Sequence, residues 1–241
     1  MSGHSKWNNI KHKKEKSDAA KAKIFTKIGK EMAVAIKAGG ADPTVNGKLR
    51  DLIAKAKANN VPNDNIQRTI KKFSENNDIN YEEISYEGYG PSGVAVIVET
   101  STDNRNRTAG NVRAWFNKFG GNMGQNGCVG FLFEEKGVIT IIDEDEEIDE
   151  DKLMEDALDS GAEDVRSDEG EYSIYTAPAD LDAVRDAILA KGYKIDTADL
   201  AKVPTTYVTL SNEDDIANME KMLDKFNEDD DVTAVYHNWD N

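Results

Sequence analysis

The two parts of this chain carry net charges of opposite sign, and this limits the chain to a basic segment joined to a separate acidic body. Residues 1–75 contain 17 Lys and Arg against 7 Asp and Glu, whereas residues 76–241 contain 13 against 39. The formal net charge of −16 for the whole chain hides this division. A uniformly acidic domain would repel a polyanion, but a separate basic segment can bind one. We therefore expect a basic nucleic-acid-binding region followed by an acidic body.

The basic segment has the hydrophobic periodicity of three amphipathic helices. The first is expected to run to about Ala38, where two glycines end it. The second lies within residues 46–60, and the third begins after Pro62, a residue favoured at the start of a helix. Residues 74–80 are polar and rich in Asn, which is typical of a domain boundary. The pattern predicts a small three-helix bundle.

Beyond Tyr81 the pattern changes to short strands that alternate with helices. Within residues 136–202 the predicted order is strand, helix, strand, strand, helix, strand, which is the ferredoxin-like order. An acidic run in this segment, residues 143–147, is expected to be a solvated loop. The segment therefore has the elements of a complete α+β domain.

Two further segments flank this series. The first is predicted to have strands at Val94–Val98 and Val129–Phe133 with a helix over Arg107–Phe119 between them, and the second repeats the order strand, helix, strand. Together they supply the elements of a second ferredoxin-like series. The weaker alternative is two separate sequential domains. The predicted fold class is α+β and multidomain, with a basic helical domain (1–79), a discontinuous α+β domain (80–135 and 203–241) and an inserted acidic α+β domain (136–202).

The most distinctive basic run lies at the N-terminus, where cations are interleaved with one indole and show no apolar periodicity. It is expected to be an extended, mobile arm that contacts phosphates and stacks Trp7 on an unpaired base. A further row of lysines lies opposite the apolar side of the first predicted helix, and a solvated lysine face is the other explanation of that row. The candidate nucleic-acid-binding residues in this region are His4, Lys6, Trp7, Lys11, His12, Lys13, Lys14, Lys16, Lys23, Lys27 and Lys30.

A second candidate site lies in the acidic body, where residues 102–107 join a strand to a helix. Two guanidinium groups at a helix N-terminus, those of Arg105 and Arg107, are suited to an anion such as phosphate. The alternative is a capping loop, in which Asp103 or Asn104 caps the helix and the arginines pair with carboxylates. The sequence leaves both interpretations open.

The aromatic residues of Gly130–Phe133 allow two interpretations. They could stack on bases, as the aromatic side chains of RNA-recognition modules do. However, the Lys or Arg that opens that signature is absent from this chain. The sequence therefore favours core packing for these side chains.

Other apparent motifs fail on their context. Residues 88–93 match the dinucleotide fingerprint in letters, but they precede a strand and are predicted to be a turn. The single Cys128 and the scattered histidines do not suit a disulfide or a zinc site. No nucleophile, base and orienting acid can be assembled from local motifs, and no apolar run approaches the ~18 residues of a membrane span. We expect a cytoplasmic protein with no catalytic residues, cofactor or metal.

Several long motifs together resemble the YebC family, whose members include the mitochondrial translational activator of cytochrome c oxidase. The resemblance implies three domains, with a helical N-terminal domain and two α+β domains. It also implies a role in gene expression, either as a DNA-binding transcriptional regulator or as a ribosome-associated translation factor. The motifs that carry the resemblance are Gly3–His12, Lys23–Lys27, Tyr86–Pro91, Thr102–Arg107 and Tyr207–Val208.

Of these two functions, the residues favour the translation factor. Readers of duplex DNA usually present Arg, Asn or Gln to base edges, whereas the first predicted helix offers Lys, Ala and Thr. Lysine is a point charge that holds phosphates, which suits the shape of structured RNA. An acidic protein-interaction module would leave the basic arm unexplained. We expect ribosomal or structured RNA, and the ribosome itself, as partners, with duplex DNA as the alternative; the sequence does not fix the target or the oligomeric state.

Overall fold

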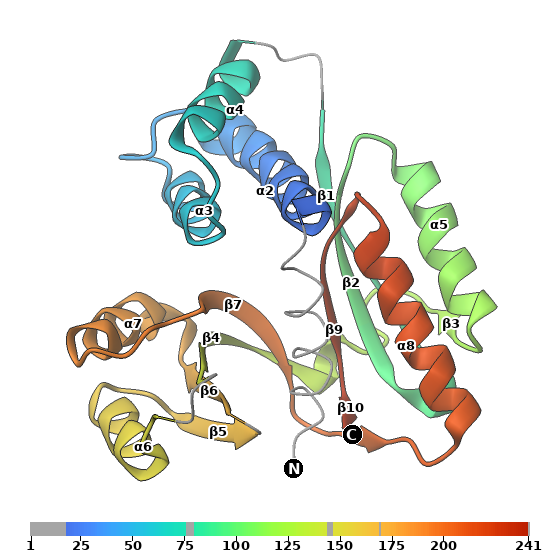
Figure 1. The fold of residues 1–241 in the computed structure, drawn as a ribbon. Coiled ribbons are helices and arrows are strands. Elements are labelled where there is room, and N and C mark those ends of the chain that lie inside the picture. Colours follow the sequence, from blue (N-terminus) through green and yellow to red (C-terminus); the bar gives the residue numbers. More distant parts are fainter. Residues whose placement is uncertain (1–17, 76–79, 144–146, 169, 241) are drawn as a thin grey trace. The chain divides into compact units, whose positions relative to one another are not determined.

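A computed structural model describes residues 18–75, 80–143, 147–168 and 170–240. These residues belong to two compact units, whose chain path is drawn in Figure 1. One unit is built around residues 132–207, and the other from residues 18–75, 80–131 and 208–239. The predicted inserted domain, residues 136–202, lies within the first unit. The helical segment and the discontinuous α+β segment share the second unit.

The helical segment consists of three helices, as predicted. Their apolar sides meet in one core, in which Ile28, Met32, Leu49 and Ile66 are almost fully buried. The buried Asn46 fixes the connection between the first two helices: its amide nitrogen donates to two backbone oxygens, and its Oδ1 accepts from the first turn of the second helix. The helices are α2 (Asp18–Gly39), α3 (Gly47–Ala58) and α4 (Asn63–Glu75).

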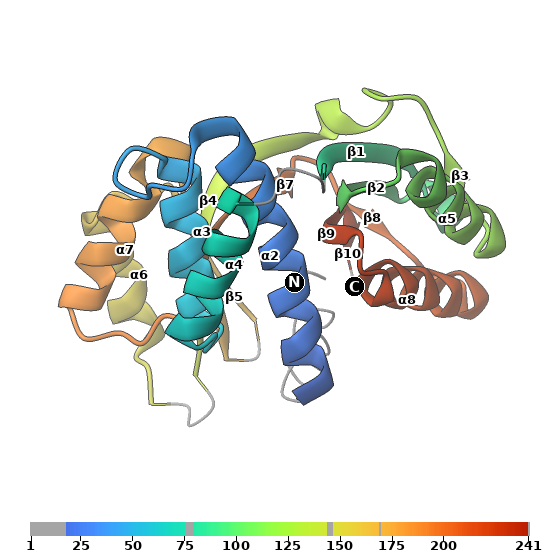
Figure 2. The same ribbon diagram turned by 90° about the horizontal axis from the view of Figure 1, so that it is seen from above.

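The α+β part of the same unit is a four-stranded antiparallel sheet with the order β3-β1-β2-β9. Two helices lie side by side on one face of this sheet (Figures 1 and 2). The rings of Phe116 and Phe226 join these helices, with their centroids 5.2 Å apart. The elements are β1 (Glu82–Tyr89), β2 (Ala95–Thr102), α5 (Arg105–Lys118), β3 (Asn122–Met123), α8 (Glu213–Glu228) and β9 (Val232–His237), and β8 (Val208–Thr209) pairs separately with β10 (Trp239–Asp240).

The order of elements in this sheet corrects one prediction. The strand expected at Val129–Phe133 is wrong, because Gly130–Leu132 is a short 3-10 helix. The strand that pairs with β2 is instead β1, which runs into the predicted turn and is connected to β2 by a 3-10 turn at Pro91–Gly93. The sequence of β1 lacks a strand pattern because three of its eight residues are glutamates and one is a glycine. Position 88 of β1 requires glycine, because a Cβ atom there would meet the Asn122 carbonyl oxygen at 2.5 Å.

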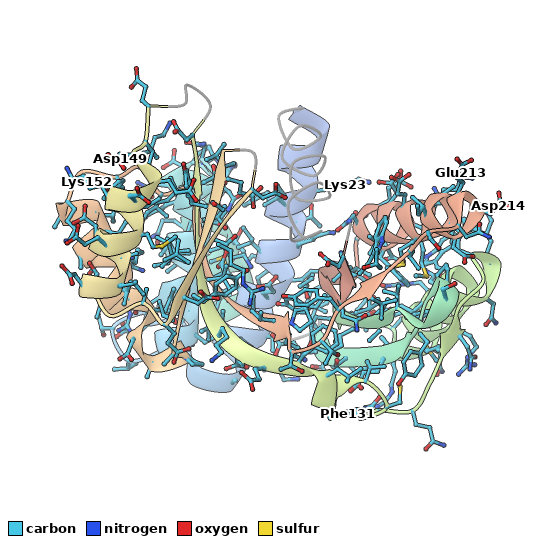
Figure 3. The ribbon with its side chains drawn as sticks, turned by 90° about the horizontal axis from the view of Figure 1, so that it is seen from below. Lys23, Phe131, Asp149, Lys152, Glu213 and Asp214 are labelled. Atoms are coloured by element: carbon cyan, nitrogen blue, oxygen red, sulfur yellow. The ribbon has the colours of Figure 1, made fainter. Side chains whose placement is uncertain are left out.

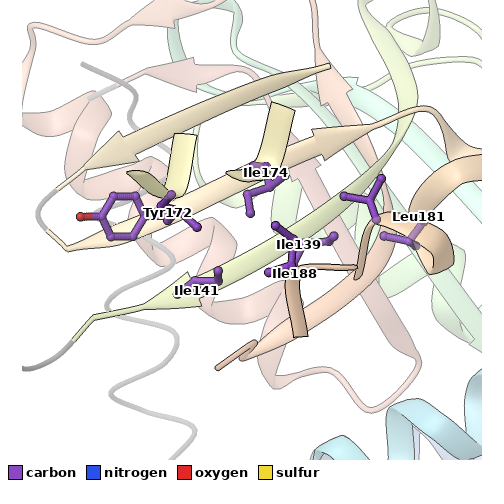
Figure 4. Packing of buried hydrophobic residues seen from close by; sticks show 9 residues of the cluster. Ile139, Ile141, Tyr172, Ile174, Leu181 and Ile188 are labelled. Carbon is purple, nitrogen blue, oxygen red and sulfur yellow. The ribbon is translucent and has the colours of Figure 1, made fainter. Parts of the chain in front are cut away.

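The unit around residues 132–207 has the predicted ferredoxin-like order, and this prediction is confirmed. Its four strands form an antiparallel sheet in the order β5-β6-β4-β7. Alternate side chains of two strands, including Ile139, Ile141 and Ile174, pack with Ile188 of a helix in one apolar core (Figure 4). The elements are β4 (Phe133–Ile142), α6 (Glu150–Asp159), β5 (Asp164–Asp168), β6 (Glu171–Thr176), a 3-10 turn (Pro178–Asp180), α7 (Leu181–Ala190) and β7 (Thr197–Pro204).

Candidate nucleic-acid interface

The basic arm lies outside the described residues. This applies to eight of the candidate residues, whose contacts with nucleic acid therefore stay predictions: His4, Lys6, Trp7, Lys11, His12, Lys13, Lys14 and Lys16.

The lysine row of α2 is engaged within the molecule. Lys23, which is labelled in Figure 3, and Lys27 donate to carbonyl groups in the last turn of α8, and Lys30 donates to the loop that follows this helix. The last carbonyl groups of a helix lack partners in the helix and carry partial negative charge, so they attract ammonium groups. The row is therefore not simply a solvated face, and phosphate would have to compete with these carbonyl groups. The three Nζ atoms donate to the backbone oxygens of Glu228 (3.3 Å), Asn227 (2.9 Å) and Asp230 (2.9 Å), respectively.

Asp231 connects α2, α5 and the start of β9. Its side chain is 5% exposed, and its Oδ1 lies 2.7 Å from Nζ of Lys30. Its Oδ2 accepts from Nη2 of Arg107 at 2.7 Å and from Oγ1 of Thr108 at 2.8 Å. Burial would raise the pKa of Asp231, but the hydrogen bonds from Lys30, Arg107 and Thr108 outweigh it and lower the pKa to about 2. The carboxylate is therefore charged at neutral pH and holds three elements together.

The same contacts decide between the two interpretations of residues 102–107. Asn104 caps α5, because its Oδ1 accepts from the backbone nitrogen of Arg107 at 3.1 Å. The Arg107 guanidinium also lies 2.8 Å from Oδ1 of Asp103, in addition to its contact with Asp231. The capping loop is the arrangement found, and it argues against a phosphate contact at Arg107. The side chain of Arg105 is exposed and has no ion-pair partner in the part of the chain that the structure describes.

A group of exposed cations on α3 and α4 was not among the predicted nucleic-acid-binding residues. Arg50 and Lys57 of α3 are seven positions apart and therefore lie on one side of that helix. Two of these cations form only long ion pairs, since Arg50 lies 3.9 Å from Asp51 and Lys71 lies 4.0 Å from Glu75. In the sequence, these residues could have been found as cations that recur opposite the apolar side of each predicted helix. These bundle cations are Arg50, Lys57, Arg68, Lys71 and Lys72.

A loop after β3 is held in place by the carboxylate of Glu87. Its two oxygens accept from the backbone nitrogens of Gly127 (2.9 Å), Val129 (2.9 Å) and Gly130 (2.7 Å). A carboxylate that accepts several backbone N–H groups makes strong, charge-assisted hydrogen bonds. The fold of the loop is thus set by a residue on β1.

This loop corrects the prediction of core packing for the aromatic residue that follows it. The side chain of Phe131, labelled in Figure 3, is 73% exposed. The bonds from Gly127, Val129 and Gly130 to Glu87 place the chain in a 3-10 turn at this point, and the turn directs the ring outward. Aromatic side chains are enriched at interfaces, so this exposed ring is a candidate contact for a partner.

Across the described ranges, no helix is long and apolar enough to cross a membrane. Within the same ranges, no three His, Cys, Asp or Glu side chains are grouped so that they could hold a metal ion.

Comparison with known proteins gives a family. The family model described as "TACO1/YebC protein N-terminal domain" matches residues 5–76, and the model described as "TACO1/YebC second and third domain" matches residues 81–239. The chain belongs to the YebC family. This confirms the resemblance found in the sequence motifs.

Relatives in the YebC family match the chain over its whole length. A protein of Agathobacter rectalis is 56% identical over 241 residues, covers 100% of both chains and is named "Probable transcriptional regulatory protein". A protein of Acetivibrio thermocellus with the same name is 55% identical over 240 residues and covers 99% of both chains. The crystal structure of a conserved hypothetical protein from Aquifex aeolicus has a TM-score of 0.84 and 41% identity, and the match covers 92% of this chain and 91% of that chain.

Proposed function

We propose that this protein is a regulator of gene expression that binds ribosomal or other structured RNA and acts as a translation factor. A role in gene expression is supported by the names of its relatives. RNA as the target is supported by the chemistry of the chain itself, which offers exposed cations for phosphates and aromatic side chains for bases.

The observation that carries the preference for RNA is the exposure of Phe131 on a fixed loop. An aromatic ring can stack on an unpaired base, and loops and bulges of folded RNA present such bases. A B-form duplex keeps its base faces stacked inside. Trp7, in the basic arm, has the same chemistry in the sequence.

The bundle cations supply the second part of the interaction. Lys and Arg side chains that contact phosphates release counterions, which gives affinity without reading the base sequence. The body of the protein, with its excess of Asp and Glu, disfavours nucleic acid over most of its own surface. RNA binding is therefore directed to the helical segment and to the loop that carries Phe131.

The alternative function is a DNA-binding transcriptional regulator, which the names of the relatives favour. The two functions differ in what they require of Phe131. Phosphate contacts serve either nucleic acid, but an exposed ring gains stacking energy only from an unpaired base.

The test is to replace Phe131 by Ala and to measure binding to a ribosomal RNA fragment with unpaired loops and to a DNA duplex. We expect affinity for the RNA to fall about tenfold, because stacking contributes ~1–3 kcal/mol per base, while duplex binding stays unchanged. Leu158→Ala is the control, since Leu158 is a large apolar side chain that is 49% exposed on α6, outside the helical segment. Equal RNA binding by both variants, or a promoter duplex that displaces excess ribosomal RNA, would favour the transcriptional alternative.

A further inference from the structure

One helix of the acidic body has the opposite charge to its surroundings. In the described part of residues 80–240, α5 is the only α-helix with no Asp or Glu, and it contains four Lys and Arg. The helix beside it, α8, contains six Asp and Glu and two Lys. The positive charge of α5 is therefore local and is not explained by the overall composition.

The cations of α5 differ in whether they are already paired. Arg107 is held by Asp103 and Asp231. Lys118 lies over the rings of Trp115 and Phe119, with its Nζ 5.8 and 5.5 Å from their centroids. Arg113, in the middle of the helix, is exposed and has no ion-pair partner among the described residues. In a chain with 46 Asp and Glu, an unpaired Arg at this position is available to an external anion.

The outer face of α5 is also unusually open around Arg113. Thr108, Val112 and Phe116 form the buried face of the helix. On the opposite side, Gly110 is exposed, and a Cβ atom placed on it would have no neighbour within 4 Å. Gly inside a helix costs about 1 kcal/mol relative to Ala, and packing within the unit does not require it here. The missing side chain leaves the helix backbone accessible beside Arg113. The exposed residues of this outer face are Asn106, Gly110, Arg113, Ala114 and Asn117.

The chemistry of this outer face fits a nucleic-acid backbone better than a protein. Cores of protein interfaces are rich in aromatic and large apolar side chains, and the outer face of α5 has none. It offers instead the guanidinium of Arg113 and the amides of Asn106 and Asn117, which are common partners of phosphate and sugar oxygens. The absence of carboxylates on α5 removes the repulsion that a polyanion meets elsewhere on the body.

We propose that the outer face of α5 is a further RNA-binding surface, at which Arg113 contacts a phosphate and Gly110 lets the sugar-phosphate backbone lie close to the helix. This proposal rests on the proposed function, because it names a further surface for the same RNA. It also adds an anion contact in the middle of α5 to the one predicted at the helix N-terminus, where Arg107 is paired and Arg105 is exposed.

The test uses the full chain and a structured ribosomal RNA fragment, with affinity measured across a range of salt concentrations. Arg113→Glu is expected to weaken binding about three- to tenfold and to reduce the slope of log affinity against log salt by roughly 0.7–0.9, the value of one phosphate contact. Lys221→Glu on α8 makes the same change in charge at an exposed residue and is the matched control.

A second variant, Gly110→Leu, distinguishes a loss of RNA binding from a loss of folding stability. The melting temperature should be unchanged or higher, because the site is open and Leu favours a helix more than Gly does. Binding to RNA should nevertheless weaken, because the new side chain occupies the place of the RNA backbone.

The outcomes distinguish this inference from the proposed function. If the unmodified protein does not bind RNA, the proposed function fails. If it binds RNA but Arg113→Glu and Gly110→Leu both behave like Lys221→Glu, the surface on α5 is overturned and the proposed function stands. If Arg113→Glu keeps its affinity for RNA yet no longer sediments with ribosomes, the face binds a ribosomal protein and the proposal is wrong.

Discussion

Replacing Asp231 by Ala is expected to lower the free energy of unfolding by ~3–5 kcal/mol, the usual effect of removing one partner from a buried ion pair. Lys30, whose side chain is 12% exposed, would keep its charge and lose the carboxylate 2.7 Å away. Thr108 would lose one of its hydrogen-bond acceptors as well, and Arg107 would keep Asp103, which is partly exposed, as its carboxylate partner. The loss is large because one carboxylate accepts from four side chains, Lys30 of α2, Arg107 and Thr108 of α5, and Thr102 of β2.

Chemical denaturation of the full chain measures this effect, and Glu83→Ala provides the comparison. Glu83 also accepts from a lysine, Lys48, at 2.7 Å, but these side chains are 42% and 53% exposed. Exposed pairs contribute ~0–1 kcal/mol, so this variant should unfold almost like the unmodified protein. Equal, small changes in both variants would mean that Asp231 does not hold α2 and α5 to the start of β9.

The carboxylate of Asp231 should also make the stability of the protein depend on pH, with stability falling in acid. Its pKa is lowered on folding from 3.8 to about 2, so its stabilisation is complete above about pH 4 and is lost as the pH falls towards 2. Between these limits, the unmodified protein should lose stability more steeply than Asp231→Asn, which has no proton to gain at this position.

Replacing three of the bundle cations, Arg50, Lys57 and Arg68, by Glu is expected to weaken RNA binding about a hundredfold at physiological salt. Three phosphate contacts correspond to a change of roughly 2–3 in the slope of log affinity against log salt. The fold should be retained, because all three side chains are exposed and none is paired more closely than 3.9 Å.

The matched control for this triple variant changes three exposed lysines outside the bundle, Lys152, Lys194 and Lys221, to Glu. It alters the net charge by the same amount, so it reports any general repulsion of RNA by a more acidic protein. Similar losses in the two triple variants would contradict a localised RNA site on α3 and α4.

The fold was predictable where apolar residues recur with a clear period. The strand that carries Ile139 and Ile141 has an unbroken run of β-branched residues over Val138–Ile142, and the unit around residues 132–207 was recognised from such strands and the helices between them. In β1, by contrast, the buried positions are Tyr86 and Gly88, and glutamates occupy several of the others. A strand with one buried glycine and few apolar residues has no signal that distinguishes it from a loop.

The candidate site was less predictable, because its decisive contacts join distant parts of the sequence. Lys30 and Asp231 are separated by 201 residues, and no local pattern relates them. The outward direction of Phe131 depends on a carboxylate, that of Glu87, more than 40 residues earlier in the chain. Sequence periodicity identified cations and aromatics, but only the fold shows which of them are paired and which are exposed.

The central claim, that the protein binds RNA, is tested most directly by crosslinking it to nucleic acid in living cells and sequencing what is attached. We expect fragments of ribosomal or other structured RNA to dominate, and the Phe131→Ala and Arg50, Lys57, Arg68→Glu variants to recover fewer of them at equal protein levels. Enrichment of promoter DNA, with RNA no more abundant than in a control without crosslinking, would contradict the claim.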